Sequence, residues 1–113
     1  MADTMIQIAQ DFSRFPGGRF IFDGPHSGEL FREQILAPAI ASGSTVTVVL
    51  DGVAGLPASF LEEAFGGLIR KGFKVPDLHR KLKIVAETKR LQRYPSQIWG
   101  YIQTAAASLD RVH

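Results

Sequence analysis

One segment constrains the fold more than any other, because it joins a β-branched strand to an amphipathic helix through a short loop. Residues 45–50 read TVTVVL, a nearly continuous apolar run that is typical of a central strand covered on both faces. An Asp-Gly turn follows at Asp51, and residues 59–71 then carry apolar side chains at helical spacing. A strand that leads directly into a helix predicts an α/β layer structure around one sheet.

The rest of the chain continues this alternation of strands and helices. Ser27 is typical of a helix N-cap, and Pro38 predicts that the helix it begins will bend or restart. Phe31, Ile35 and Ala39 stand four residues apart and are expected on the buried face of that helix. Since the first two expected strands flank a Pro-Gly-Gly turn, the sequence predicts a small mixed sheet with packed helices. Further strands are expected at residues 5–9, 19–22 and 82–86, and a last helix is expected from Pro95.

The composition narrows the class of protein. A chain of 113 residues is long enough for one hydrophobic core, so we expect a single domain over residues 1–113. The lack of cysteine excludes disulfides, thiolate catalysis and cysteine-ligated metals. The sequence has neither a basic and apolar leader nor the roughly 20 consecutive apolar residues that a membrane span needs. We therefore expect a cytoplasmic protein.

The net charge of +2 conceals an uneven distribution. Residues 70–93 hold nine basic and two acidic side chains, whereas residues 1–69 hold three basic and eight acidic ones. The basic segment is either a solvated connector or a surface that attracts an acidic partner. Nucleic-acid binding is not expected, because no interleaved aromatic residues and no helix-turn-helix spacing accompany the basic residues.

Ser59 is the residue of greatest chemical interest. Together with Glu62 it forms an S-x-x-E pattern ahead of an apolar run, which predicts a capping box at the start of a helix. The unpaired N–H groups of a helix N-terminus also suit an anion, so Ser59 is a candidate phosphoacceptor as well as a helix cap. The small and apolar loop residues beside this helix start are expected to be exposed as a partner surface. This surface consists of Leu56, Pro57, Ala58, Glu62 and Glu63.

A second cluster gathers charged and hydroxyl side chains in the glycine-rich stretch of residues 17–32. Such loops can cradle a phosphate, but this stretch matches neither a Walker loop nor G-x-G-x-x-G. Since nearby carboxylates would neutralise its arginines, we expect an ion pair between Arg19 and Asp23 and a turn cluster that braces the first helix against the strand at residues 19–22. Binding of a nucleotide or another small ligand is the alternative. The cluster consists of Arg19, Asp23, Ser27 and Arg32, with Asp51 as a further loop residue.

The sequence gives no support for catalysis or a bound metal. His26, His79 and His113 are scattered along the chain, and no G-x-S-x-G nucleophile motif is present. Asp51 lies at the carboxyl end of a strand, where sites gather in open α/β sheets, and it either forms a turn or supports the Ser59 loop. No second carboxylate stands near it at metal-ligand spacing. We expect no enzyme activity, no catalytic residue, no metal and no cofactor.

From Asp51 onward the sequence resembles a STAS domain, the fold of anti-sigma-factor antagonists. In these domains a D/S-G-V step after a strand is followed by D-S-S-G-L at the start of a helix. Residues 51–53 match the step, and Ser59 stands at the second serine, which is the phosphorylated one in that family. Pro57, Ala58 and Phe60 differ from the pattern.

A larger part of the chain, from Ile6 to about Trp99, is similar to the STAS-like family of small uncharacterised bacterial and archaeal proteins. The shared segments are FS and PGGR within residues 12–19, DG, SGE and FRE within residues 23–33, and SFLEEAFG at residues 59–66. The resemblance implies a single STAS-like α/β domain that acts as a non-enzymatic regulatory protein-interaction module, similar to an anti-sigma-factor antagonist. Its partner would be a protein such as a histidine-kinase-like ATPase or an anti-sigma factor. A small-molecule or nucleotide sensor that uses the glycine-rich loops is the alternative.

Overall fold

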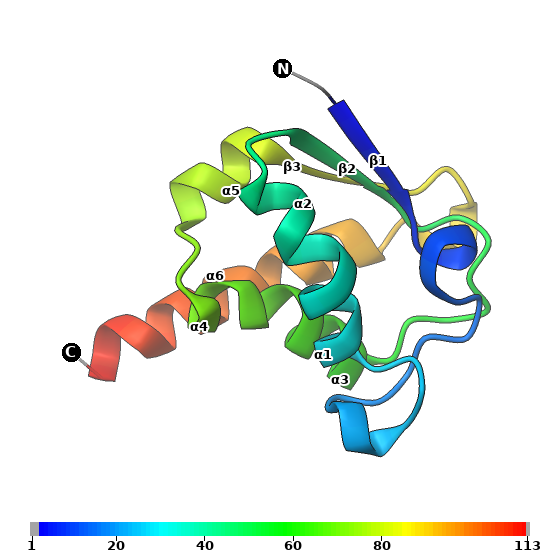
Figure 1. The fold of residues 1–113 in the computed structure, drawn as a ribbon, viewed down its shortest axis with the longest axis horizontal. Coiled ribbons are helices and arrows are strands. Elements are labelled where there is room, and N and C mark those ends of the chain that lie inside the picture. Colours follow the sequence, from blue (N-terminus) through cyan, green and yellow to red (C-terminus); the bar gives the residue numbers. More distant parts are fainter. Residues whose placement is uncertain (1–2, 113) are drawn as a thin grey trace.

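The computed structural model describes residues 3–112, in which helices pack on a three-stranded parallel sheet with the strand order β1-β2-β3 (Figure 1). The register runs from Asp3 opposite Thr45 to Gln7 opposite Val49 in the first pair of strands. The second pair continues the same rows toward β3. The α/β architecture expected from the sequence is confirmed. The strands are β1 (Asp3–Gln7), β2 (Thr45–Val49) and β3 (Leu82–Val85).

Helical segments make up most of the remaining chain. Two long helical runs and the last helix form the layer beneath the sheet, and α5 leads into β3 (Figure 1). The first run comprises α1 (Gly28–Phe31), η3 (Arg32–Leu36) and α2 (Ala37–Ala41), and the second comprises α3 (Ala58–Leu61), η4 (Glu62–Gly66) and α4 (Gly67–Lys71). The others are η1 (Ile8–Phe12), η2 (Ile21–Asp23), α5 (Val75–Lys81), η5 (Lys89–Leu91) and α6 (Tyr94–Val112).

The sheet is parallel rather than mixed, because the strand expected at residues 19–22 does not form. This stretch folds locally instead: the Asp23 carboxylate accepts the Phe20 N–H at 2.8 Å, and the short helical turn η2 follows. The rings of Phe20 and Phe22 stack with their centroids 5.6 Å apart at the tip of an exposed loop. A short apolar run beside a Pro-Gly-Gly turn was therefore an insufficient signal for a strand, since a local side-chain acceptor satisfied a backbone N–H that a neighbouring strand would have paired.

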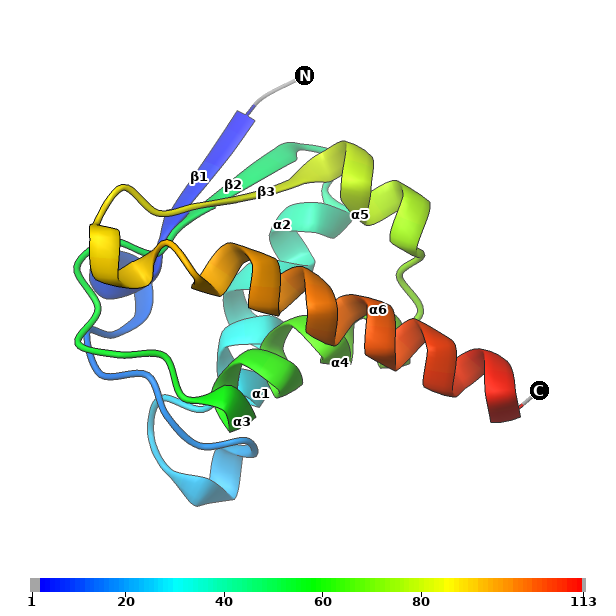
Figure 2. The ribbon, with the colours of Figure 1, turned by 180° about the vertical axis from the view of Figure 1, so that it is seen from behind.

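The helices cover only one face of the sheet (Figures 1 and 2). Ile6, Val48 and Ile84 are buried beneath it, whereas on the opposite face Met5 is 62% exposed and Val85 is 39% exposed. The central strand was expected to be covered on both faces. Within residues 3–112 the second face has no cover, so the apolar run of β2 reflects burial on one side only.

A π-helical turn shifts the buried face of the first helical run by one residue. Ile35 and Ala39 are only half-buried, and Leu36 and Ile40 are fully buried in their place. Segment η3 inserts this extra residue directly before Pro38, which has no N–H to continue the ordinary ladder of helical hydrogen bonds. The predicted restart is confirmed, since α2 begins at Ala37 beside Pro38, and the extra residue in η3 explains why the simple four-residue spacing failed.

The second helical run fills the core between the first run and α6. The ring of Phe31 lies 5.8 Å from that of Phe60 and 6.3 Å from that of Phe65. Glycine in the middle of a helix allows a close approach of a neighbouring element, and Gly66 and Gly67 could let this helix approach the sheet. Instead, Gly67 lies against the Arg32 side chain, on the first helical run. The apolar residues predicted for this helix are all buried: Phe60, Leu61, Ala64, Phe65, Leu68 and Ile69.

Candidate functional site

The start of α1 is capped and tightly packed. The fully buried Ser27 hydroxyl accepts the Leu30 N–H at 3.1 Å, which confirms the predicted N-cap. The next residue, Gly28, lies so close to α3 that a Cβ there would be 2.4 Å from the Phe60 carbonyl oxygen. Ser27 therefore has a structural role, and Gly28 lets the two helical runs approach each other.

The start of α3 is not capped by Ser59, so the predicted capping box is wrong. The helix begins one residue earlier, at Ala58, because Pro57 adopts the extended N-cap conformation and its carbonyl accepts the Leu61 N–H at 3.1 Å. Ser59 thus stands in the first helical turn. Its side chain is half-exposed and makes no hydrogen bond to any other residue that the structure describes.

The carboxylate expected to complete the capping box is held by two arginines instead. Glu62 forms an ion pair with Arg19 and accepts two hydrogen bonds from Arg70, at 2.7 and 3.1 Å. Burial raises the pKa of Glu62, but the ion pairs with Arg70 and Arg19 lower it by more, so it lies below its ordinary value. The same contact raises the pKa of Arg70.

A buried ion pair joins the two helical runs. Arg32 Nη1 lies 2.7 Å from Glu63 Oε2, and both residues are less than a tenth exposed. Arg32 Nε also lies 2.9 Å from Glu33, whose other oxygen is 2.7 Å from Lys71 Nζ. Hydrogen bonds from Lys71 and then Arg32 lower the pKa of Glu33. We call this set the inter-helix charge network; it consists of Glu33, Glu62 and Glu63 with Arg19, Arg32, Arg70 and Lys71.

The loop cluster expected around Arg19 forms with different partners. Arg19 does not pair with Asp23, whose carboxylate bonds the Phe20 N–H, and it reaches across to Glu62 and to Glu63 at 3.6 Å. Arg19 thus ties its loop to the second helical run, and the predicted bracing of the first helix against a strand at residues 19–22 is wrong, because that strand does not form. The two arginines that a phosphate would require are both occupied by carboxylates.

The partner surface expected beside α3 is only partly exposed. Pro57 and Ala58 are exposed and Glu62 is half-buried, as a loop at a helix start allows. Leu56 and Glu63 are buried, which corrects the expectation for both. Leu56 belongs to the hydrophobic core, and Glu63 is drawn inward by its ion pair with Arg32.

A shallow hollow of about 490 Å³ lies next to this helix start, and we call it the loop hollow. Phe15 forms its most exposed wall, at 70% exposure, and faces Ala54, Pro57 and Tyr94. The two loops are joined by a hydrogen bond from the Ala54 N–H to the Arg14 carbonyl at 2.7 Å. Sequence reasoning missed Phe15 and Tyr94, because their proximity depends on two loops far apart in the chain.

A charged side chain fixes the same loop from the other side. Arg90 Nη2 donates to the Val53 carbonyl at 2.7 Å, so part of the basic segment is used to hold the backbone beside the loop hollow. Asp51 likewise connects the loops that follow β2 and β3: it accepts the N–H groups of Glu87 and Thr88. Hydrogen bonding by Thr88 and then by the Glu87 N–H lowers the pKa of Asp51. Asp51 therefore supports the loop after β3 and not the Ser59 loop.

No group of three or more histidine, aspartate or glutamate side chains within residues 3–112 is placed to hold a metal ion. No helix among the described residues combines the length and the apolar character that crossing a membrane requires.

The comparisons with known proteins place this geometry in a family. A family model for a STAS-like domain of unknown function (DUF4325) matches residues 27–91, which is more than half of the chain and includes both helix starts. The comparison with curated proteins and the comparison with solved structures gave no match. The resemblance inferred from the sequence motifs is confirmed: this chain belongs to the family of STAS-like domains of unknown function.

Proposed function

We propose that this chain is a cytoplasmic, non-enzymatic regulatory module that binds a protein partner through the start of α3 and the loop hollow beside it. The observation that carries the proposal is the exposed ring of Phe15, which stands over a hollow next to the exposed Pro57 and Ala58. A large exposed apolar side chain beside a concave surface is typical of a protein-binding site.

The class of partner follows from the fold family alone. By analogy with STAS anti-sigma-factor antagonists, we propose a histidine-kinase-like ATPase or an anti-sigma factor as the partner. Ser59 is the proposed phosphoacceptor, since this residue is half-exposed next to the exposed Pro57 and Ala58. It also lies in the first turn of a helix, where a phosphate would meet the positive end of the helix dipole. Nucleotide binding by Arg19 and Arg32 is less favoured, because carboxylates occupy both guanidinium groups.

A binding measurement with purified components tests the proposal. Each histidine-kinase-like ATPase and anti-sigma factor encoded in the same genome would be titrated against the chain, the Phe15→Asp variant and a matched Phe22→Asp variant. Phe22 is 84% exposed on a different loop, so its substitution controls for a general loss of surface hydrophobicity. We expect Phe15→Asp to weaken binding at least about tenfold, the effect of removing one central apolar contact, and Phe22→Asp to leave it unchanged. Equal affinities for all three proteins would contradict the proposal.

Phosphorylation is tested separately from binding. The ATPase that binds would be incubated with ATP and either the wild-type chain or Ser59→Ala, and the mass of each would be measured. A mass increase of one phosphate in the wild type only supports the proposed switch. Phosphate on both proteins, or on neither, would remove Ser59 from the proposal and leave the binding surface standing.

A further inference from the structure

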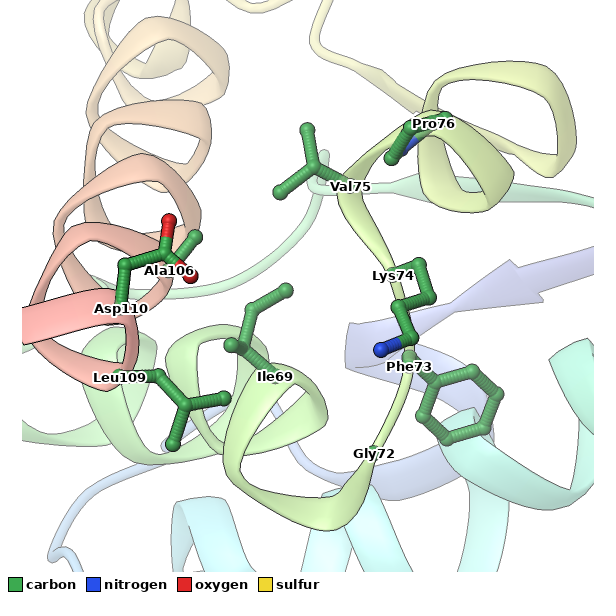
Figure 3. A pocket seen from close by; sticks show the side chains of 9 residues that line it. All are labelled: Ile69, Gly72, Phe73, Lys74, Val75, Pro76, Ala106, Leu109 and Asp110. Atoms are coloured by element: carbon green, nitrogen blue, oxygen red, sulfur yellow. The ribbon is translucent and has the colours of Figure 1, made fainter. Parts of the chain in front are cut away.

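A second hollow, of about 280 Å³, lies at the other end of the second helical run from the α3 surface, between the end of α4 and the last turns of α6 (Figure 3). Its lining is largely apolar: Ile69 comes from α4, Val75 from the start of α5, and Ala106 and Leu109 from α6 (Figure 3). Leu109 is 40% exposed. We call this hollow the α4–α6 groove.

One wall of the groove has a fixed backbone. Gly72 ends α4 with a φ of 116°, and its N–H bonds the Ile69 carbonyl at 3.0 Å. The Phe73 N–H bonds the Leu68 carbonyl at 3.0 Å, which completes the paired hydrogen bonds of a Schellman motif. The chain is therefore held in one conformation as it turns away from α4 toward α5, and a partner would meet this wall already formed.

The two walls carry opposite charges. Lys74 projects from the loop wall and Asp110 from the α6 wall (Figure 3). Both residues are exposed, and neither forms an ion pair with any residue in the described range 3–112. An exposed cation and an exposed anion on either side of an apolar floor are thus both available to a partner.

This arrangement is complementary to itself. A two-fold axis that runs along a groove brings each wall of one copy opposite the other wall of its partner. The contact then contains two equivalent pairs, each between Lys74 of one copy and Asp110 of the other, and the two apolar floors face each other. A different protein would need the same two charges in the reverse order to match both walls, whereas a second copy supplies them by symmetry.

We propose that two copies of this chain associate through the α4–α6 groove about such an axis, with the apolar linings of the two grooves, Leu109 among them, packed against each other. The end of α6, which carries Leu109 and Asp110, extends beyond the other helices at this corner of the molecule (Figures 1 and 2). The contact leaves Phe15 and Ser59 untouched. Dimerisation is therefore independent of the function proposed above.

Sedimentation equilibrium of the full chain tests this proposal over the micromolar to millimolar range. We expect wild type to pass from its 12.4 kDa monomer to a dimer with rising concentration. Lys74→Glu and Asp110→Lys should each weaken dimerisation at least about tenfold, because each puts two like-charged pairs into the contact. The double variant Lys74→Glu/Asp110→Lys should restore it, since the pairs are then opposite in charge again.

Two further variants make the result specific. Leu109→Asp should abolish the dimer, while Lys89→Glu, a charge reversal of an exposed residue in η5, should leave it unchanged. Circular dichroism of every variant checks that the fold is retained. The proposal would be overturned if the wild-type chain stays monomeric at every concentration. It would also be overturned if Lys74→Glu and Asp110→Lys both leave the dimer dissociation constant unchanged. Failure of the double variant to recover would do the same.

Discussion

The two long helical runs each begin near a serine, but the two serines do different things. At the start of α1 the Ser27 hydroxyl is fully buried and caps the helix through the Leu30 N–H. At the start of α3 the cap position belongs to Pro57, and Ser59 is a half-exposed residue in the first turn. One serine is part of the structure, whereas the other is free to take part in a function.

Neighbouring residues explain the difference. Pro57 adopts an extended conformation and the helix begins directly after it. Ser59 is therefore the second residue of the helix and does not occupy the N-cap position. Glu62, which would have closed a capping box, is held by Arg19 and Arg70. A capping pattern therefore predicts a cap only where no earlier residue can start the helix and no cation competes for the glutamate.

The largest expected effect concerns the ion pair that joins the two helical runs. Arg32→Met would leave the Glu63 carboxylate buried without its partner and should reduce the free energy of unfolding by about 3–5 kcal/mol, as measured by urea denaturation. Glu33→Gln, which removes an exposed partner of the same arginine, should cost less than about 1 kcal/mol. The double variant Arg32→Met/Glu63→Leu should recover most of the loss. A similar cost for Arg32→Met and Glu33→Gln would mean that the buried pair does not join the runs.

The next effect tests the two serines directly. Ser27→Ala removes a buried cap and should reduce the free energy of unfolding by about 0.5–2 kcal/mol. Ser59→Ala removes a hydroxyl without a hydrogen-bond partner among the described residues and should change it by less than about 0.5 kcal/mol. Thermal and urea denaturation of both variants give the comparison. An equal loss in the two variants would show that Ser59 caps α3 in solution after all.

Much of the fold could be predicted because the signals were local. The β-branched run of β2, the Ser27 cap and the disturbance at Pro38 each follow from a few neighbouring residues, and all three are present. The six apolar residues of the second run followed from helical spacing. Helix α5, by contrast, was not expected, because its basic sequence looked like a connector; Leu78 is its buried contact with the core.

The candidate site was harder to predict because it depends on contacts between distant segments. The pair of Arg32 with Glu63 spans 31 positions, and the hydrogen bond of Arg19 with Glu62 spans 43. A separation of 31 or 43 positions matches no helical or strand period, so a single sequence does not indicate that these residues are in contact. The same is true of Phe15, which meets Pro57 only after both loops have folded. The sequence shows several acidic and basic residues in these segments, but it does not show which carboxylate pairs with which arginine.

The smallest expected effect is a pH dependence of the free energy of unfolding that arises at the start of α3 and not at the start of α1. The α1 cap is a hydroxyl and does not titrate, whereas Glu62 beside α3 is a carboxylate. Burial raises its pKa, and the ion pairs with Arg70 and Arg19 lower it further than burial raises it. A carboxylate with a lowered folded-state pKa stabilises the protein above its unfolded pKa of about 4.3, and this contribution is lost as the pH falls through the folded-state value.

Glu62→Gln removes that titration and should therefore lower the free energy of unfolding at about pH 7. The difference from wild type should be smaller at about pH 3, because the wild-type carboxyl takes up protons as the pH falls toward its folded-state pKa. Urea denaturation at both pH values measures the difference. Ser27→Ala is the matched control, because the loss of a hydroxyl cap should be the same at both pH values. If Glu62→Gln also costs the same at both, the contribution of Glu62 comes from packing rather than charge, and the contrast between a neutral start at α1 and a charged start at α3 does not hold.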